Sequence, residues 1–184
     1  AAQIPTPFTE RLFRKKSAAF QYLELQPFQA LHIALFQGVI TKGGDSRNVQ
    51  HPDWQYFNPV IFSHWATYGL DDPSLNVLTG ADILIRFTRR LGLYMQFMTD
   101  RINTGGLQAG LKYFDAFGLR NLTLRTEYNR TDNDSYHSSN STSYTHYNQN
   151  LAFTPPNGNE LLFMADYRKN RIFVSGRFHR QLKE

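Results

Sequence analysis

Apolar and polar residues alternate one by one through a long segment in the middle of the chain, from Gly106 to Arg130. A period of two is typical of a β-strand with one apolar and one polar face. The residues from Asp115 to Gly118 supply a turn, so the segment is predicted to form a hairpin. The apolar face carries Leu107, Ala109, Leu111 and Tyr113, then Leu122, Leu124, Thr126 and Tyr128; the polar face carries Gln108, Gly110 and Lys112, then Asn121, Thr123, Arg125, Glu127 and Asn129.

Each arm of this hairpin is about ten residues long, which corresponds to roughly 33 Å of strand. Strands of soluble sandwiches usually have about five or six residues. A tilted strand that crosses a membrane needs about nine to eleven. Strand length therefore favours an all-β transmembrane barrel over a soluble β-sandwich lectin, which is the competing fold.

The same alternation recurs on both sides of the central hairpin. Pro27 is expected to stop the first strand. Together the segments predict about eight spanning strands in an antiparallel up-and-down order, enough for a small closed barrel or for one arc of a larger one. Besides the hairpin, strands are expected at residues 17–26, 30–39, 76–88, 91–101, 160–168 and 171–180.

One segment breaks the alternation and predicts a short helix from Pro59 to Tyr68. Asn58 is a suitable N-cap before a first-turn proline, and Gly69 stands where a C-terminal cap is expected. Topology supports the helix, because short turns of such a barrel lie at one end and long loops at the other. The turns fall at one common end only if residues 41–75 make no net crossing.

Composition limits the classes of protein further. The chain has 184 residues, net charge +5 and no Cys. This length suits one domain, so residues 1–184 are expected to form a single outer-membrane β-barrel domain. The absence of Cys excludes disulfides and thiolate sites. The sequence contains no apolar run of about 18 residues, so no transmembrane helix is expected. Basic residues are spread over strands and turns, so no nucleic-acid partner is expected. The polar, proline-broken start is not a signal peptide, and both ends are interpreted as cut.

The most polar part of the chain, residues 130–150, predicts a surface loop. Aromatic rings pack on sugars, while amides and hydroxyls bond sugar hydroxyls, so this loop is a candidate glycan site. The plainer interpretation is that residues 145–149 only fix the loop to the barrel rim. The candidate residues are Tyr136, His137, Tyr144, His146, Tyr147, Asn148 and Gln149.

Three further groups of residues have both a functional and a plainer interpretation. Trp54 and Trp65 mark an aromatic cluster that forms either part of a plug or glycan platform, or a helix packed into the barrel mouth. Glu127 and Asp100 are possible paired carboxylates, but a salt-linked polar wall with the basic residues of the same faces is the simpler account. Asp132, Asp134, His137 and His146 form a poor metal set that lacks the Gly and Glu of a calcium loop. No catalytic motif occurs, so neither enzyme activity, cofactor nor metal is expected.

Three further segments stand out in order along the chain: YFNPVIF (56–62), LKYFDAFGLRNLTLRTEYN (111–129) and THYNQ (145–149). They resemble the Wzi-type capsule-assembly outer-membrane proteins, in particular the Bacteroidetes branch that includes gliding-motility proteins of the RemB type. The resemblance implies a barrel of about eighteen strands, of which this chain is an incomplete arc. The sequence departs from these relatives at residues 130–135 and 150–153, and both departures fall on the proposed external loop.

The resemblance also implies a function and a location. The chain is expected in the bacterial outer membrane, in contact with its lipid, as a non-enzymatic protein that binds or organises surface capsular polysaccharide. The alternative is a structural or interaction subunit of a gliding-motility or type IX secretion surface complex, in which the loops bind protein.

Overall fold

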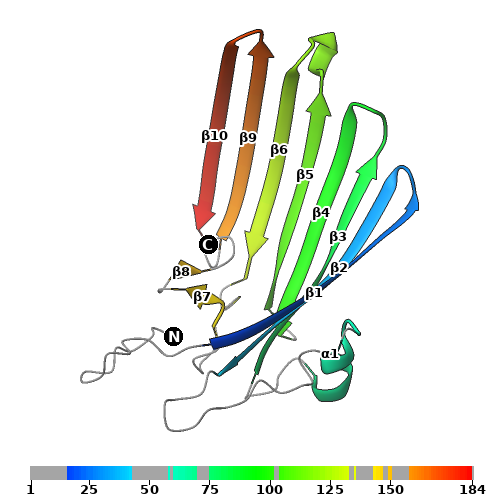
Figure 1. Cartoon of the computed structure of the whole chain (residues 1–184). Helices are drawn as coiled ribbons and strands as arrows, with labels where there is room; N and C mark the ends of the chain where they lie inside the picture. Colours follow the sequence, from blue (N-terminus) through cyan, green and yellow to red (C-terminus); the bar gives the residue numbers. More distant parts are fainter. Residues whose placement is uncertain are drawn as a thin grey trace.

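The residues with alternating polarity form long strands that pair into one antiparallel sheet (Figure 1). The computed structural model describes residues 16–42, 58, 60–69, 75–101, 104–132, 135, 143–146, 149–150 and 158–183. Eight strands lie in the order β1-β2-β3-β4-β5-β6-β9-β10. They are β1 Lys16–Phe28, β2 Leu31–Lys42, β3 Leu75–Arg86, β4 Leu91–Arg101, β5 Thr104–Phe114, β6 Leu122–Thr131, β9 Gly158–Lys169 and β10 Ile172–Lys183.

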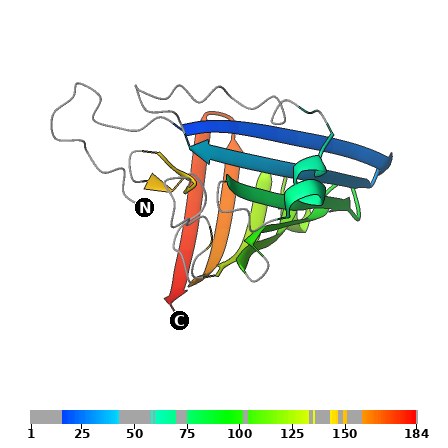
Figure 2. The same cartoon turned by 90° about the horizontal axis from the view of Figure 1, so that it is seen from below.

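The predicted all-β, antiparallel, up-and-down arrangement of the strands is confirmed. Neighbours in space are neighbours in sequence, except that β9 pairs with β6 after a small separate hairpin, β7 Thr145–His146 with β8 Gln149–Asn150. The eight-stranded sheet is not closed, because β1 and β10 are its edges in the described part of the chain. Figure 2 shows that the sheet is curled, with β1 and β2 across one side and β9 and β10 at the other.

The strand register sorts the side chains onto two faces as the alternation predicts. One face is apolar in every strand and exposes large side chains, with exposed fractions from 38% at Tyr128 to 67% at Ile172. The opposite face is mostly polar. The exposed apolar residues of the first face include Leu23, Leu25, Met95, Phe97, Leu161, Phe163, Val174 and Phe178.

The connections divide between the two ends of the sheet as predicted, although the short connection between β4 and β5 lies at the end of the long ones. The turns β1–β2, β3–β4, β5–β6 and β9–β10 all lie at one end of the sheet (Figure 1), which we call the turn end. The segments between β2 and β3 and between β6 and β9 start and finish at the other end. Because β2 and β3 are adjacent and antiparallel, the chain between them starts and finishes at the same end of the sheet. This is the arrangement predicted for residues 41–75.

The predicted helix exists but begins later than expected. Helix α1 is Ser63–Tyr68. Phe62 occupies the N-cap position with φ 65° and makes no side-chain cap bond. Asn58 instead accepts a bond from the Val60 N–H at 3.0 Å, which forms a turn of its own. Gly69 is the C-cap as predicted, with φ 76° and its N–H bonded to the carbonyl of Trp65.

Two details of the strands differ from the sequence prediction. Pro27 does not stop β1, because β1 is an edge strand and its register with β2 shifts between Leu25 and Phe28, a place where proline is tolerated. The turn of the central hairpin tightens into a short 3-10 helix, η2 Ala116–Gly118. Among the described residues, no helix has the length and apolarity needed to span a membrane.

A small core lies on the polar side of the sheet, near the end with the long connections. It contains Ile40, Met98 and Tyr144, with Phe36 and Leu78 packed against them. Phe36 also lies across Gly80, where a Cβ atom would overlap its ring. The strand β2, the strand β4 and the loop after β6 are thereby held together at this end.

Candidate functional site on the concave face

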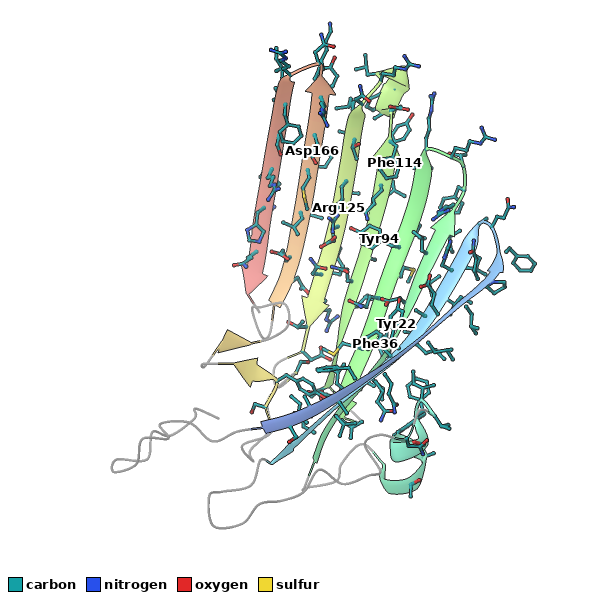
Figure 3. The ribbon with its side chains drawn as sticks, in the orientation of Figure 1. Tyr22, Phe36, Tyr94, Phe114, Arg125 and Asp166 are labelled. Carbon is teal, nitrogen blue, oxygen red and sulfur yellow. The ribbon has the colours of Figure 1, made fainter. Side chains whose placement is uncertain are left out.

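The polar face is the concave face of the curled sheet. Side chains of this face from β1 to β5 line one common hollow of about 390 Å³, which requires the face to curve around it. Figure 3 shows Tyr22, Tyr94 and Arg125 on this side, from the edge to the middle of the sheet. One cross-strand row contains Glu24, Ala34, Asp82, Gln96, Gln108, Asn129, Glu160 and Gln181.

The best-connected group of this face is the carboxylate of Glu127 on β6, which is 4% exposed. The Tyr94 hydroxyl and the Arg125 guanidinium both donate to its Oε2. Gln108 and Asn129 donate to its Oε1 at 3.0 and 2.9 Å. Four donors therefore satisfy this carboxylate, as buried charges require.

A glycine makes this arrangement possible. Gly110 lies between Tyr94 and Glu127 in the register, and a Cβ atom there would overlap the Tyr94 ring. The ring lies across the glycine and brings its hydroxyl within 2.8 Å of Arg125 Nε. The Lys112 ammonium is 4.9 Å and the Arg125 guanidinium 5.4 Å from the ring centroid, within cation–π range.

The network continues to the last two strands. Asn129 donates a second bond to Glu160 Oε2 at 3.0 Å. Glu160 also pairs with the Nε2 atom of His179 on β10. The predicted salt-linked wall is therefore present. Asp100 is not the partner of Glu127, because it lies near the end of β4 with the long connections, where it accepts a hydrogen bond from the Thr104 hydroxyl at 2.5 Å.

The hollow itself combines the groups that bind polyhydroxylated molecules. Two phenol rings, Tyr22 and Tyr94, face it together with the carboxylates of Glu24 and Asp82 and the amide of Gln96. Aromatic faces pack on sugar rings, carboxylates accept from hydroxyls, and amides do both. His32 also lines it and contacts Glu24 Oε1 at 3.2 Å through Nδ1.

Tyr144 of the predicted glycan loop is an anchor instead of an exposed sugar platform. It is 4% exposed, and its hydroxyl donates toward the carbonyls of Gly38 and Asn76, at 2.8 and 3.0 Å. Burial, together with the nearby Asp100 carboxylate, raises the pKa of this phenol, which keeps the donor proton in place. Tyr144 therefore fixes the loop to the sheet, whereas the plainer interpretation of residues 145–149 stays a prediction, because their side chains lie outside the described part of the structure.

The same loop is fixed at its start. The Asp132 carboxylate accepts from the Gly105 N–H at 3.0 Å and lies 3.8 Å from Arg130. The Ser135 hydroxyl donates to the Gly105 carbonyl at 2.9 Å. Asp132 is thus engaged as a structural residue, and the described residues contain no group of three or more His, Asp or Glu arranged for a metal ion.

The other predicted site residues are distributed as follows. His146 and Gln149 lie in the short hairpin β7–β8, where only the backbone is described. Trp65 on α1 is 48% exposed and meets Phe62 edge-on at 6.0 Å. Tyr136, His137, Tyr147, Asn148 and Trp54, together with Asp134 of the metal set, lie outside the described residues.

Helix α1 is attached to the apolar, convex side of the sheet. The Phe62 N–H donates to Gln37 Oε1 at 2.7 Å, and Gln37 shares that face with Leu35 and Gln21. Trp65 and Tyr144 therefore lie on opposite faces of the sheet. The interpretation of α1 as a helix inside the concave mouth is wrong for its described contacts.

Sequence reasoning missed the residues that line the hollow. Tyr22 and Glu24 belong to β1 and Asp82 belongs to β3, and neither strand points to a site when it is considered alone. The available signal was the register: Glu24 and Asp82 stand in the same cross-strand row as Gln96 and Gln108 once the strands are paired, and Tyr22 lies two residues from Glu24 on the same face. Comparisons with protein-family models, with curated proteins and with solved structures find no match to this chain.

Proposed function

We propose that the chain forms part of the wall of a bacterial outer-membrane β-barrel, with its convex face toward lipid and its concave face toward an aqueous lumen. The main observation in support is the continuous apolar face of the long strands, on which Met95, Phe97 and Phe163 are 38%, 55% and 45% exposed. Soluble proteins rarely expose apolar patches larger than a few hundred Å². A lipid environment removes that cost.

Strand dimensions support the same placement. The strands of the sheet contain 10 to 13 residues. At a tilt of about 45° such strands span an apolar layer of roughly 25 Å. The turn end then corresponds to the periplasmic side and the long connections to the outer side, as in other barrels of this type.

We further propose that the barrel binds or organises surface polysaccharide without catalysing a reaction. The hollow beside Tyr22 and Tyr94 supplies stacking faces, carboxylates and amides in one place, and the three segments that resemble Wzi-type proteins support the same ligand class. The most buried carboxylate of the network, Glu127, is occupied by four donors, so it does not act as a free base.

Cysteine accessibility tests the membrane placement. The sequence has no Cys, so Met95→Cys and Gln96→Cys place single thiols of this segment on neighbouring residues of opposite faces. In carbonate-washed outer membranes, a water-soluble maleimide is expected to label Gln96→Cys, whereas Met95→Cys reacts only after denaturation. Equal labelling of both thiols, or recovery of the protein in the soluble fraction, contradicts the proposal.

Polysaccharide retention tests the ligand. The full-length protein in detergent is titrated with capsular polysaccharide from the producing strain, as wild type, as Tyr22→Ala/Gln96→Ala and as Gln181→Ala. Gln181 is the matched control, because it lies in the same cross-strand row but on the far edge. We expect the double variant to lose affinity by about tenfold and the control to bind normally. Absence of binding by the wild type, together with cross-links to other proteins, favours an interaction subunit instead.

A further inference from the structure

A second hollow, at the turn end of the concave face, is lined by basic residues. It measures about 710 Å³, and its charged lining residues are Arg86, Arg89, Arg90 and Lys112. Among the described residues no carboxylate lines it, and Gln26, Gln29 and Thr88 supply further polar groups. Concave walls of one charge sign concentrate the electrostatic potential and attract ions of the opposite sign.

The positive charges of this hollow are poorly compensated. Within the described parts of the chain, Arg86, Arg89 and Lys112 form no ion pair, and Arg90 only approaches Asp115 at 4.0 Å. Lys112 lies opposite Arg125 across β5 and β6, but Arg125 is already paired with the Glu127 carboxylate. A bound anion would therefore compensate the four cations that line the hollow.

A glycine opens the floor of the hollow between two of the cations. In the register, Gly92 stands between Arg86 on β3 and Lys112 on β5. The nearest atom to a Cβ placed at Gly92 is the Ile85 carbonyl oxygen at 3.6 Å, an ordinary contact distance. A side chain would therefore fit there sterically, and its absence leaves space that a ligand can enter.

The walls are fixed by hydrogen bonds, so the site is preorganised. Thr88 Oγ1 accepts from the N–H groups of Arg90 and Leu91 at 3.1 and 3.0 Å. The Arg86 N–H donates to the Ala30 carbonyl at 2.7 Å and the Phe114 N–H to that of Arg90, also at 2.7 Å. These bonds tie the β1–β2 turn, the β3–β4 turn and the end of β5 together.

We propose that this hollow binds a linear polyanion that carries several phosphate or carboxylate groups. Arginine forks match both groups in a bidentate manner, and lysine adds a compact charge. Hollows of a few hundred to about 1,000 Å³ hold drug-sized ligands, so the size fits a chain segment better than a single ion. This proposal depends only on the arrangement of the strands and turns and not on the proposed polysaccharide function. The site lies at the end of the sheet opposite to the glycan loop.

Binding to the full-length protein in detergent tests the inference. Three probes are titrated by calorimetry at low salt: inorganic tripolyphosphate, oligogalacturonate, and neutral dextran oligomers of similar length. We expect the first or the second to bind, with the tighter one identifying the chemical source of the charge. Dextran is expected not to bind this site, and sodium chloride at about 0.5 M is expected to weaken polyanion binding strongly.

The two hollows share Leu84, Arg86 and Lys112, so the two test variants change only residues outside the polysaccharide hollow. Arg89→Gln/Arg90→Gln removes charge, and Gly92→Val fills the floor; none of the three residues lines the other hollow. Each variant is expected to weaken polyanion binding by about tenfold or more. Arg168→Gln/Arg171→Gln is the matched control, since both arginines lie at the β9–β10 turn of the same end, outside the hollow.

The outcomes separate this site from the proposed function. Polyanion binding that is lost in both variants but kept in the control and in Tyr22→Ala/Gln96→Ala supports the site, whatever happens to capsular polysaccharide. The inference is overturned if neither polyanion binds at low salt, if both variants bind as the wild type does, or if the control loses as much affinity as they do. It is also overturned if dextran binds and responds identically.

Discussion

The two faces of the sheet differ in how their side chains are stabilised. On the convex face, Phe163 remains 45% exposed and Met95 38% exposed, and such side chains gain stability only from apolar surroundings. On the concave face, Glu127 is 4% exposed and accepts hydrogen bonds from four donors. Its stability comes from the chain itself.

This difference shows that a shift of one residue along a strand moves a side chain from an apolar to a polar environment, or the reverse. Leu162 and Phe163 are sequence neighbours, yet Leu162 pairs with Glu127 among the polar groups and Phe163 pairs with Thr126 on the apolar face. The comparison can be tested by placing the same charge at both positions.

The largest effect is expected from a charge on the convex face. Phe163→Lys should lower the free energy of unfolding in lipid vesicles by about 3 kcal/mol, because a lysine near the middle of the apolar layer must leave water. Urea titration of the reconstituted full-length protein measures the change.

Leu162→Lys is the control for that variant. Its ammonium would face the Glu127 carboxylate, so we expect a change within about 1 kcal/mol. A loss at Leu162 equal to that at Phe163 would mean that both faces meet the same environment, and the assignment of lumen and lipid would fail.

Much of this two-faced fold could be predicted from the sequence. Alternation is a local property, so the faces of β4, with Leu93 and Met95 opposite Gln96, follow directly from the residue order. Strand ends were less accurate where a local rule met its exception: Pro27 stays in β1 because that strand is at the edge, and α1 starts at Ser63 because Phe62, not Asn58, precedes it as the cap.

The candidate sites were harder to predict, because they depend on pairing between distant strands. Tyr22 and Gln96 line one hollow although they are far apart in the chain, and only the register brings them to the same side. Tyr144 shows the opposite difficulty. An aromatic residue in a polar loop suggests a ligand platform, but the ring is buried against Ile40 and Met98, a contact that no local pattern encodes.

The second prediction concerns the concave network. Glu127→Leu should cost about 2 kcal/mol of stability, because Arg125, Gln108 and Asn129 lose their common acceptor while remaining partly or fully buried. Glu24→Leu is the matched control. The Glu24 side chain is 56% exposed, and among the described residues its hydrogen-bond partner is His32. An equal loss in both variants would show that the network adds nothing beyond a surface carboxylate.

The third prediction concerns Tyr144, which packs against Ile40 and Met98 near one end of the concave face. Tyr144→Phe should destabilise the protein by about 1 kcal/mol, since the carbonyls of Gly38 and Asn76 lose a donor in a buried place. Tyr128→Phe removes a hydroxyl bond to Asn159 on the exposed convex side and should change stability by less than about 0.5 kcal/mol. Proteolysis of the loop should rise only in the first variant.

The smallest expected effect is the alkaline response of the same phenol, and it separates a buried anchor from a residue exposed to ligand. Burial raises the pKa of Tyr144 in the folded protein above its ordinary value, so the folded state holds this proton more tightly than the unfolded state does. Its stabilising contribution is therefore complete below about pH 10, the ordinary pKa of tyrosine, and declines as the pH rises above it. Urea titrations at about pH 9 and pH 11 should show a larger loss in the wild type than in Tyr144→Phe, by up to about 1 kcal/mol. Equal losses in the two proteins would mean that the hydroxyl titrates normally and that the loop end of the concave face is open to water.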